Sequence, residues 1–432
     1  MTSIARARLA ATRAENAYVL PSSTPLAAVD GSSEPPIMDL RYSPAELAFR
    51  EEVTAFVRDN LPDDIRTRLR QGHQPRKQDV VTWQRILNRR GWATPSWPRS
   101  HGGPGWSALE RLIFSEALFA APAPEPLSFN STMVGPVIIQ FGSPAQKAML
   151  PAIANLDLWF CQGFSEPDAG SDLASLRTTA RRDGDHYVVT GQKIWTSTAH
   201  EADWMFCLVR TGTSPRRQEG ISFLLIDMAL PGITVRPIPT LDKVPHVNEV
   251  FLDEVRVPFA MLVGEENKGW DYAKFLLTNE RTGIARIGKS RERLSRAREL
   301  AATQRVRGGT MDRDPAFRER VALLEAELRA VEITQLRVIA NQARQSDGRP
   351  DPFSSVLKLK GSELQQAAHE LLLTVGGPAA LRRAVPQDGT NLDEDWAAPL
   401  APAYYFSRSA SIYGGSSEIQ KNILAKGVLG LS

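Results

Sequence analysis

The stretch GFSEPDAGSDLAS, residues 163–175, stands where the sequence changes from helical to strand-like periodicity, and GQKIWTST (191–198) follows it closely. Short runs of β-branched and aromatic residues occur at 187–189, 204–209, 221–226, 233–235 and 250–257. Turn-forming glycines and prolines bound these runs, which is typical of an all-β unit. The sequence therefore predicts a β middle domain over residues 156–265.

Helical periodicity lies on both sides of this unit. Before it, Ser43 and Glu46 have the spacing of a capping box, and helical stretches cover about 78–90, 107–121 and 144–153. After it, long periodic stretches cover 266–306, 314–346 and 353–376, and a last helix begins near 416. We expect an α+β multi-domain fold, with a helical domain at 38–155 and a helical bundle at 266–432.

Residues 1–37 differ from the rest. The segment PSSTPLAAVDGSSEPP (21–36) has the composition of a flexible tail, and no helical period is sustained before it. We interpret residues 1–37 as a disordered extension or the product of an upstream start codon.

Length and composition limit the classes of protein. The 432 residues suggest about three structural units, and the net charge of +3 (52 basic, 49 acidic) is too small to favour nucleic-acid binding. Two cysteines cannot form a disulfide framework, and no apolar run reaches the ~18 residues that a membrane-spanning helix needs. We expect a soluble, cytoplasmic protein without a membrane span.

The absence of several sequence motifs argues against several classes of enzyme. No GxGxxG follows a strand, no phosphate-binding Walker loop is present, and the six histidines show no HxxxH or cysteine pairing. Ser165 lacks the second glycine of a nucleophile elbow. The sequence therefore predicts no metal site, and it does not favour a hydrolase, a kinase or a nicotinamide-dependent enzyme.

The two opening motifs resemble those of the acyl-CoA dehydrogenase family. The resemblance continues in the same order through VNEVFLDEVRVP (247–258), VGEENKGW (263–270), NER (279–281) and IYGGSSEIQKNILAKGVLG (412–430). It covers about residues 39–432, with Phe164 where the family usually has an aliphatic residue. It implies an FAD enzyme with a helical N-domain, a β-barrel-like middle domain and a C-terminal four-helix bundle.

The resemblance also assigns cofactor residues. A flavin that accepts hydride develops negative charge on its ring, which backbone donors and hydroxyl groups at a strand edge can stabilise. The implied FAD-binding positions are Gln162, Phe164, Ser165, Gly170, Ser171, Trp195, Ser197, Gly376, Ser416 and Glu418. Ser171, Arg281 and Gly414 are implied to bind substrate. Glu166 and Asp172 are interpreted as structural residues.

The catalytic base is displaced from its commonest place. The family usually carries a carboxylate directly after the tyrosine of the last motif, and here that position is Gly414. In subfamilies that resemble long-chain and isovaleryl-type dehydrogenases, the base comes from a helix of the C-terminal domain, and the matching residue is Glu280. The alternative interpretation of Glu280 and Arg281 is a surface ion pair. In the catalytic interpretation, Arg281 would stabilise the acyl or flavin environment.

Two departures fall on the adenine half of the FAD site. The family's Arg-x-x-Phe-Gly element is replaced by ATQRVRGGTMDRDPAF (302–317), where Arg305 or Arg307 is a candidate substitute. Leu373 stands where a later motif has glutamine. Such losses resemble subfamilies for steroid side chains and dicarboxylic acids that pair two different subunits. We weigh a heterotetramer with a paralogous subunit against a homo-oligomer.

The resemblance implies conversion of an acyl-CoA to a trans-2-enoyl-CoA in fatty acid or steroid side-chain β-oxidation. The α-proton goes to Glu280, the β-hydride goes to flavin N5, and electron-transfer flavoprotein is the expected acceptor. Two alternatives stay open: a flavin oxidase or hydroxylase of the same fold, and a partner subunit of a heteromeric dehydrogenase.

Overall fold

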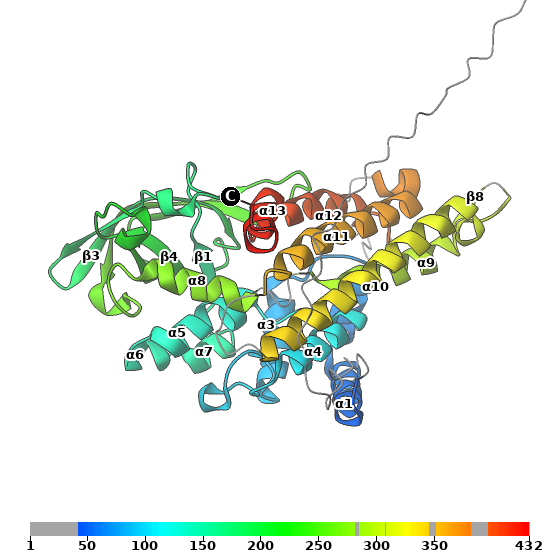
Figure 1. The fold of residues 1–432 in the computed structure, drawn as a ribbon, viewed down its shortest axis with the longest axis horizontal. Coiled ribbons are helices and arrows are strands. Elements are labelled where there is room, and N and C mark those ends of the chain that lie inside the picture. Colours follow the sequence, from blue (N-terminus) through cyan, green and yellow to red (C-terminus); the bar gives the residue numbers. More distant parts are fainter. Residues whose placement is uncertain (1–41, 281–284, 307, 345–350, 382–395, 432) are drawn as a thin grey trace, which may run out of the picture. The chain divides into compact units, whose positions relative to one another are not determined.

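The computed structural model describes residues 42–280, 285–306, 308–344, 351–381 and 396–431. The predicted order of helical, β and helical regions is confirmed (Figure 1). The prediction for residues 1–37 lies outside the described residues.

The N-terminal region is helical, and its first helix begins as predicted. The backbone N–H of Ser43 donates to Glu46 Oε2 at 2.6 Å, and the N–H of Glu46 donates to Ser43 Oγ at 3.3 Å. This reciprocal cap satisfies two backbone donors that the first turn would leave unpaired. The helices are α1 (Pro44–Asn60), α2 (Asp63–Arg70), α3 (Lys77–Arg89), α4 (Ala108–Ala120), α5 (Gly135–Phe141), α6 (Pro144–Lys147) and α7 (Leu150–Ala154).

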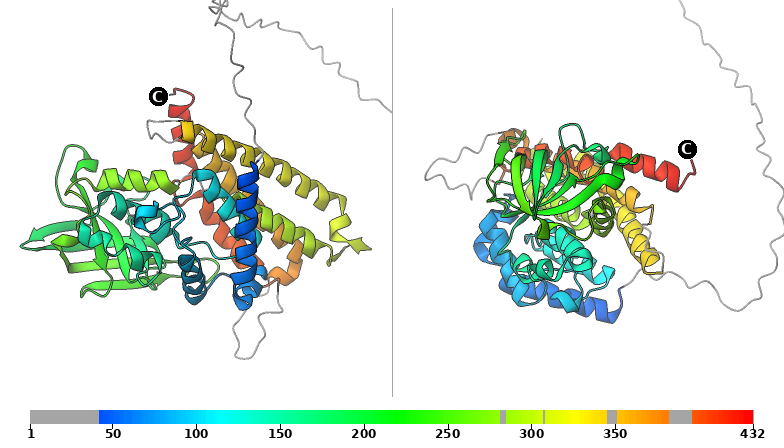
Figure 2. Two further views of the ribbon diagram at one scale, coloured as in Figure 1. Left: turned by 90° about the horizontal axis from the view of Figure 1, so that it is seen from below. Right: turned by 90° about the vertical axis from the view of Figure 1, so that its left-hand side faces the viewer.

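A seven-stranded sheet follows in the order β1-β4-β2-β3-β7-β6, with β5 paired to β4. Strand β1 runs parallel to β4, whereas β2, β3, β7 and β6 pair in antiparallel fashion. The sheet curls without closing on itself (Figures 1 and 2). The strands are β1 (Phe160–Gly163), β2 (Thr179–Asp183), β3 (His186–Ser197), β4 (Trp204–Arg210), β5 (Ile221–Asp227), β6 (Ile233–Ile238) and β7 (Val247–Pro258).

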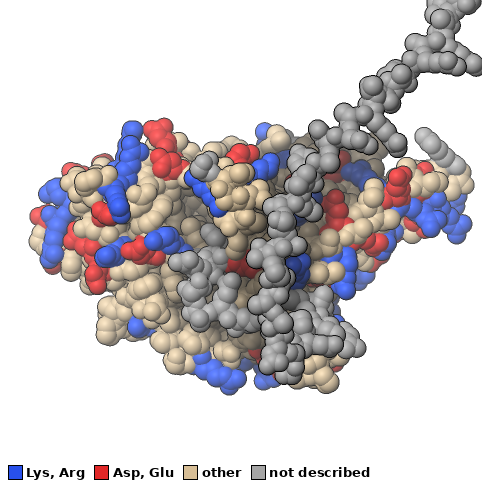
Figure 3. Space-filling view, in the orientation of Figure 1, with Lys and Arg blue, Asp and Glu red and all other residues tan. Residues whose placement is uncertain are grey.

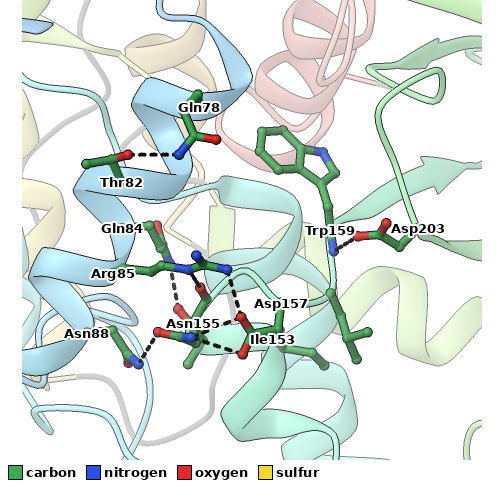
Figure 4. Close-up of polar contacts among 12 residues, drawn as sticks. Gln78, Thr82, Gln84, Arg85, Asn88, Ile153, Asn155, Asp157, Trp159 and Asp203 are labelled. Atoms are coloured by element: carbon green, nitrogen blue, oxygen red, sulfur yellow. Dashed lines mark hydrogen bonds and ion pairs between the residues drawn. The ribbon is translucent and has the colours of Figure 1, made fainter.

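Polar contacts join the N-terminal helices to the start of the sheet. Arg85 of α3 donates to Asp157 Oδ1 at 2.9 Å, and Asn88 donates to Asn155 Oδ1 at 3.1 Å (Figure 4). The backbone N–H of Trp159 donates to Asp203 Oδ2 at 2.8 Å. These contacts fix the chain directly before β1, which carries the first motif.

The C-terminal region is helical again, and α11 is its centre. Helix α11 packs against α9, α10, α12 and α13, and α9, α10 and α11 run side by side (Figures 1 and 2). A short β8–β9 hairpin (Arg305–Val306 and Gly309–Thr310) lies between α9 and α10. The helices are α8 (Gly269–Glu280), α9 (Ile287–Ala301), α10 (Pro315–Arg344), α11 (Ser354–Gly376), α12 (Leu400–Ser407) and α13 (Ser417–Gly427).

Helix α8 connects the sheet to the helical regions. It contacts β5 on one side and the π-helical turn Phe129–Val134 on the other. Its buried residues Ala273 and Leu276 belong to one apolar cluster with Phe206 and Phe223 of the sheet. The body of α8 is thus fixed by packing on both sides, and the helix ends four residues after Leu276, at Glu280.

Candidate functional site

Folding brings the two opening motifs together at one edge of the sheet. The first motif leaves β1 at Gly163, and the second forms the end of β3. The backbone N–H of Ile194 donates to the carbonyl oxygen of Ser165 at 3.0 Å. Ser165 and Ser197, both half-buried, therefore belong to neighbouring segments, and Gln162 lies in β1 opposite Phe206 of β4.

Trp195 has an unusual conformation at this edge. The register between β3 and β7 shifts between Lys193 and Thr196, and Trp195 lies in that bulge with a φ of +60°. A left-handed conformation costs a non-glycine residue about 1–2 kcal/mol. The indole is nevertheless 58% exposed. An exposed aromatic ring on strained backbone, in the same strand end as Ser197, is suited to covering the face of a flavin ring.

Phe164 fills the space behind this edge. Its ring meets those of Phe206 and Phe223 edge to face, with centroid distances of 5.7 and 6.2 Å. Gly163, directly before it, has no room for a side chain, because an added Cβ would lie 2.3 Å from Met205 Sδ. The aromatic residue at position 164 is thus accommodated by aromatic partners on β4 and β5.

A buried ion pair lies beneath the two motifs. Lys193 is fully buried, and its Nζ donates to Glu166 Oε1 at 2.8 Å, to the Leu208 carbonyl at 2.7 Å and to the Phe164 carbonyl at 3.2 Å. Glu166 also accepts backbone N–H groups from Arg177 and Thr178.

Burial alone would raise the pKa of Glu166, but Lys193 and these hydrogen bonds outweigh burial and lower it. The geometry agrees with the structural interpretation of Glu166. Asp172, the other acid interpreted in this way, is exposed, and its Oδ2 lies 3.6 Å from Arg217 Nη1.

Gly170 and Ser171 lie in an exposed turn after this ion pair. Glu166 and Ala169 form an isolated bridge directly before these two residues, and an added Cβ on Gly170 would meet nothing within 4 Å. The turn is accessible to a ligand, and both residues stay predicted contacts.

The predicted C-terminal positions have local roles in this chain. Ser416 caps α13, because its hydroxyl oxygen accepts the Ile419 N–H at 3.4 Å. An added Cβ on Gly376 would lie 2.7 Å from the Cβ of Ala380, so Gly376 is needed for close packing. Glu418 is exposed in the first turn of α13. Their roles in FAD binding stay predictions.

A cavity of about 410 Å³ lies between the N-terminal and C-terminal helices. Gly414, with a φ of +65°, and Tyr413 border it on one side, and Phe275 of α8 borders it on another. Trp97, Leu112, Phe119 and Ile139 supply apolar lining. The vacant base position and α8 therefore face the same space.

Two acids border this cavity, and each has its own cations. Glu116 forms an ion pair with Arg291. Glu125 is bound by Lys289, and its Oε2 lies 3.9 Å from Arg286 Nη1. Burial alone would raise the pKa of Glu125, but Lys289 and Arg286 outweigh burial and lower it to about 2. The carboxylate of Glu125 is therefore ionised throughout the physiological range.

The proposed base lies at the edge of the described residues. Glu280 is the last residue of α8, and Arg281 lies outside the described residues. Arg305, a candidate substitute for the missing arginine element, is exposed in β8, and Arg307 lies outside the described residues.

Both cysteines are structural. Cys161 of β1 and Cys207 of β4 are fully buried, and burial raises the pKa of both thiols, that of Cys207 to about 11. Among the described residues, no group of histidine, cysteine, aspartate or glutamate side chains could hold a metal ion. None of the helices in the described ranges is long and apolar enough to cross a bilayer.

Sequence reasoning missed Lys193 and the residues of the cavity. A signal for Lys193 was present, because Tyr187, Val189 and Lys193 share one face of a strand whose side chains alternate. Arg111 likewise occupies the apolar stripe of α4 with Phe114 and Leu118, at helical spacing. In each case a cation on a buried face was the observable clue.

Comparisons with known proteins agree along the whole described chain. Family models for the acyl-CoA dehydrogenase N-terminal, middle and C-terminal domains match residues 43–157, 161–255 and 267–429. The acyl-CoA dehydrogenase IpdE1 of Mycobacterium tuberculosis is 37% identical over 390 residues, which cover 89% of this chain and 97% of that protein.

Two solved structures are similar. The ChsE4–ChsE5 complex from Mycobacterium tuberculosis shares 32% identity at a TM-score of 0.78, over 91% of this chain and 100% of that chain. The Tcur3481–Tcur3483 steroid ACAD shares 28% identity at a TM-score of 0.78, over the same shares of both chains. This chain belongs to the acyl-CoA dehydrogenase family, whose members are FAD-dependent oxidoreductases.

Proposed function

We propose that this enzyme converts an acyl-CoA to the trans-2-enoyl-CoA, with Glu280 as the base that removes the α-proton. The observation that carries the proposal is the shared cavity. Gly414 offers no side chain there, and α8, which ends at Glu280, supplies part of the wall through Phe275.

The position of Glu280 on its helix supports this role. Positions four and seven residues apart lie on nearly the same face of an α-helix, so position 280 shares a face with Ala273 and Leu276. Both are buried in the cluster that joins α8 to the sheet. Helix geometry alone therefore favours an inward-facing position for residue 280 over the surface position that an exposed ion pair would need.

The thioester must also be polarised before a carboxylate can remove its α-proton. Gly414 is suited to this, because it borders the cavity and carries no side chain, so its backbone N–H would donate to the thioester oxygen. Arg281 would add positive charge near the acyl group or the flavin. Both groups lower the energy of the enolate-like charge that develops as Glu280 takes the proton.

FAD, when bound, supplies the hydride acceptor for the β-position. Ser165 and Ser197 would hydrogen-bond the polar edge of its ring, and Trp195 would cover one face. Gly170, Ser171, Ser416 and Glu418 would contact the rest of the cofactor. The exposed Trp195 on strained backbone, in the same strand end as Ser197, supports this placement.

The decisive experiment is anaerobic mixing of the purified yellow enzyme with a panel of acyl-CoA thioesters. Glu280→Gln should abolish bleaching of the flavin absorbance while FAD stays bound, because the amide cannot accept the proton. The matched control is Glu265→Gln, an exposed glutamate before α8, which should bleach like the wild type. Full bleaching by Glu280→Gln would contradict the assignment of the base.

The electron acceptor is tested in the same preparation. We propose that electron-transfer flavoprotein reoxidises the substrate-reduced enzyme, so adding it should restore the yellow colour while air restores it slowly. Rapid reoxidation by air would instead favour the alternative of an oxidase or hydroxylase with the same fold.

We also propose that the chain assembles with a paralogous subunit. The departures at 302–317 and Leu373 affect the half of the FAD site that crosses a subunit interface, and the similar ChsE4–ChsE5 structure is a complex. Ile412, Leu429 and Leu431 are exposed apolar side chains, as expected at a subunit contact.

Native mass spectrometry and the FAD content per chain test this assembly. After coexpression with the paralogous chain, we expect a mixed tetramer with fewer flavins than chains. A homo-oligomer with one FAD per chain would contradict it.

A further inference from the structure

The charged residues around the cavity differ in whether they have an ion-pair partner. Glu116 and Glu125 each have a cation from α9, as described above. Arg111 of α4 also borders the cavity, yet no carboxylate of the described residues lies within ion-pair distance of its guanidinium. Its one described hydrogen bond runs from Nη1 to the carbonyl oxygen of Trp106, at 3.3 Å.

Arg111 is placed there by its helix. It precedes Phe114 by three residues and Leu118 by seven, and both of these are buried, so Arg111 extends the apolar stripe of α4. Burial lowers the pKa of Arg111, although the guanidinium stays charged at neutral pH. Removing a cation from water without a counter-charge is costly, and none of the described carboxylates pairs with Arg111, so its retention on this stripe points to a ligand as the partner.

The rest of the cavity limits what that ligand is. Apolar side chains from different segments, among them Leu112, Ile139 and Phe275, supply much of the wall, which suits a bulky hydrocarbon body. Arg111 adds unused N–H donors to this wall, and a guanidinium pairs best with oxygen acceptors. A purely aliphatic chain would cover Arg111 without satisfying it.

We infer that Arg111 determines specificity by hydrogen-bonding an oxygen acceptor on the acyl part of the substrate, at a distance from the thioester. A carboxylate and a ring ketone share this chemistry. The inference rests on the proposed function, because it places the acyl group in this cavity. Arg111 recognises the substrate and takes no part in the proton transfer.

Measuring ligand binding in the absence of turnover tests the role of Arg111 separately from the proton transfer. The Glu280→Gln enzyme should bind acyl-CoA without reacting, so calorimetry can compare three ligands of equal chain length: a plain acyl-CoA, one that ends in a carboxylate and one that ends in a ring ketone. We expect at least one oxygenated ligand to bind about tenfold more tightly than the plain one, which corresponds to about 1.4 kcal/mol.

The matched variant is Arg111→Leu in the same background, with Arg111→Gln as a second variant that retains hydrogen-bond donors. Arg111→Leu should abolish the preference and leave binding of the plain acyl-CoA equal or tighter, and Arg111→Gln should retain a preference for the ketone. The inference would be overturned if Arg111→Leu kept the preference for an oxygenated ligand. It would also be overturned if the Glu280→Gln enzyme with Arg111 intact bound the plain ligand most tightly. Normal binding without flavin bleaching in the wild type would overturn the proposed function alone.

Discussion

Two lysine–glutamate pairs lie inside this enzyme, and their surroundings differ. Lys193 and Glu166 are sealed in the sheet, where protein groups meet each donor of the ammonium group. Glu125 borders the cavity, and its partner Lys289 also lies with its ammonium group 5.2 Å from the centre of the Phe119 ring. The sealed pair maintains the shape of the sheet edge where the two opening motifs meet, whereas the open pair leaves a charged group at the cavity wall.

The largest effect is expected from breaking the sealed pair. Lys193→Met should lower the free energy of unfolding by about 3–5 kcal/mol, because it leaves Glu166 buried without its counter-charge. Urea denaturation and the FAD content of the purified protein measure this. The double variant Lys193→Met/Glu166→Leu should recover part of the loss, and equal stability of the single variant and the wild type would show that the pair is dispensable.

A smaller and pH-dependent effect is expected from the open pair. The pKa of Glu125 is lowered to about 2 from an ordinary value of 4.5, so its contribution is fully present above pH 4.5 and is lost as the pH falls towards 2. Because the side chain is 33% exposed, we expect this contribution to be only about 2 kcal/mol. Urea titrations at pH 7, 4 and 3 measure it.

Glu125→Gln should be less stable than the wild type at pH 7 and should lose this part of the acid dependence. The exposed Glu265→Gln serves as the control and should keep the wild-type profile. An unaltered acid profile in Glu125→Gln would show that the open pair behaves like a surface pair.

The smallest effect on stability is expected two residues from Lys193. Trp195→Ala should change the free energy of unfolding of the FAD-free protein by less than about 1 kcal/mol, because the indole is largely exposed. Flavin affinity should nevertheless fall, as measured by fluorescence titration with FAD. A large loss of stability with unchanged FAD affinity would mean that Trp195 has a structural role, as the sealed pair does, and does not contact the flavin.

The sequence predicted the motif-bearing parts of the molecule better than the cavity. Local periodicity located helices such as α10 and α11, and the capping box at Ser43 was confirmed. Strand β2 was not predicted, because a strand of five residues gives too little alternation to recognise. Helices α2 and α12 were missed because each has 8 residues, which is too short for a helical period to be recognised.

The cavity could not be predicted, because its lining comes from segments that are distant in the sequence. Arg111, Ile287 and Gly414 meet only after α4, α9 and the last motif have packed together. Nothing local to Arg111 indicates that Glu116 is already paired with Arg291. Charge balance of this kind depends on tertiary contacts, so it becomes visible only in the folded chain.

The cysteines add no reactive group to the surface of the folded chain. The face shown in Figure 3 instead carries a mixture of basic and acidic side chains. The chain has two thiols in total, and both are fully buried with pKa values raised by burial. At neutral pH the folded enzyme should therefore resist alkylating reagents. A cysteine introduced on the exposed turn at Ser171 would be the single labelling site, so a fluorophore there could report ligand binding without prior removal of native cysteines.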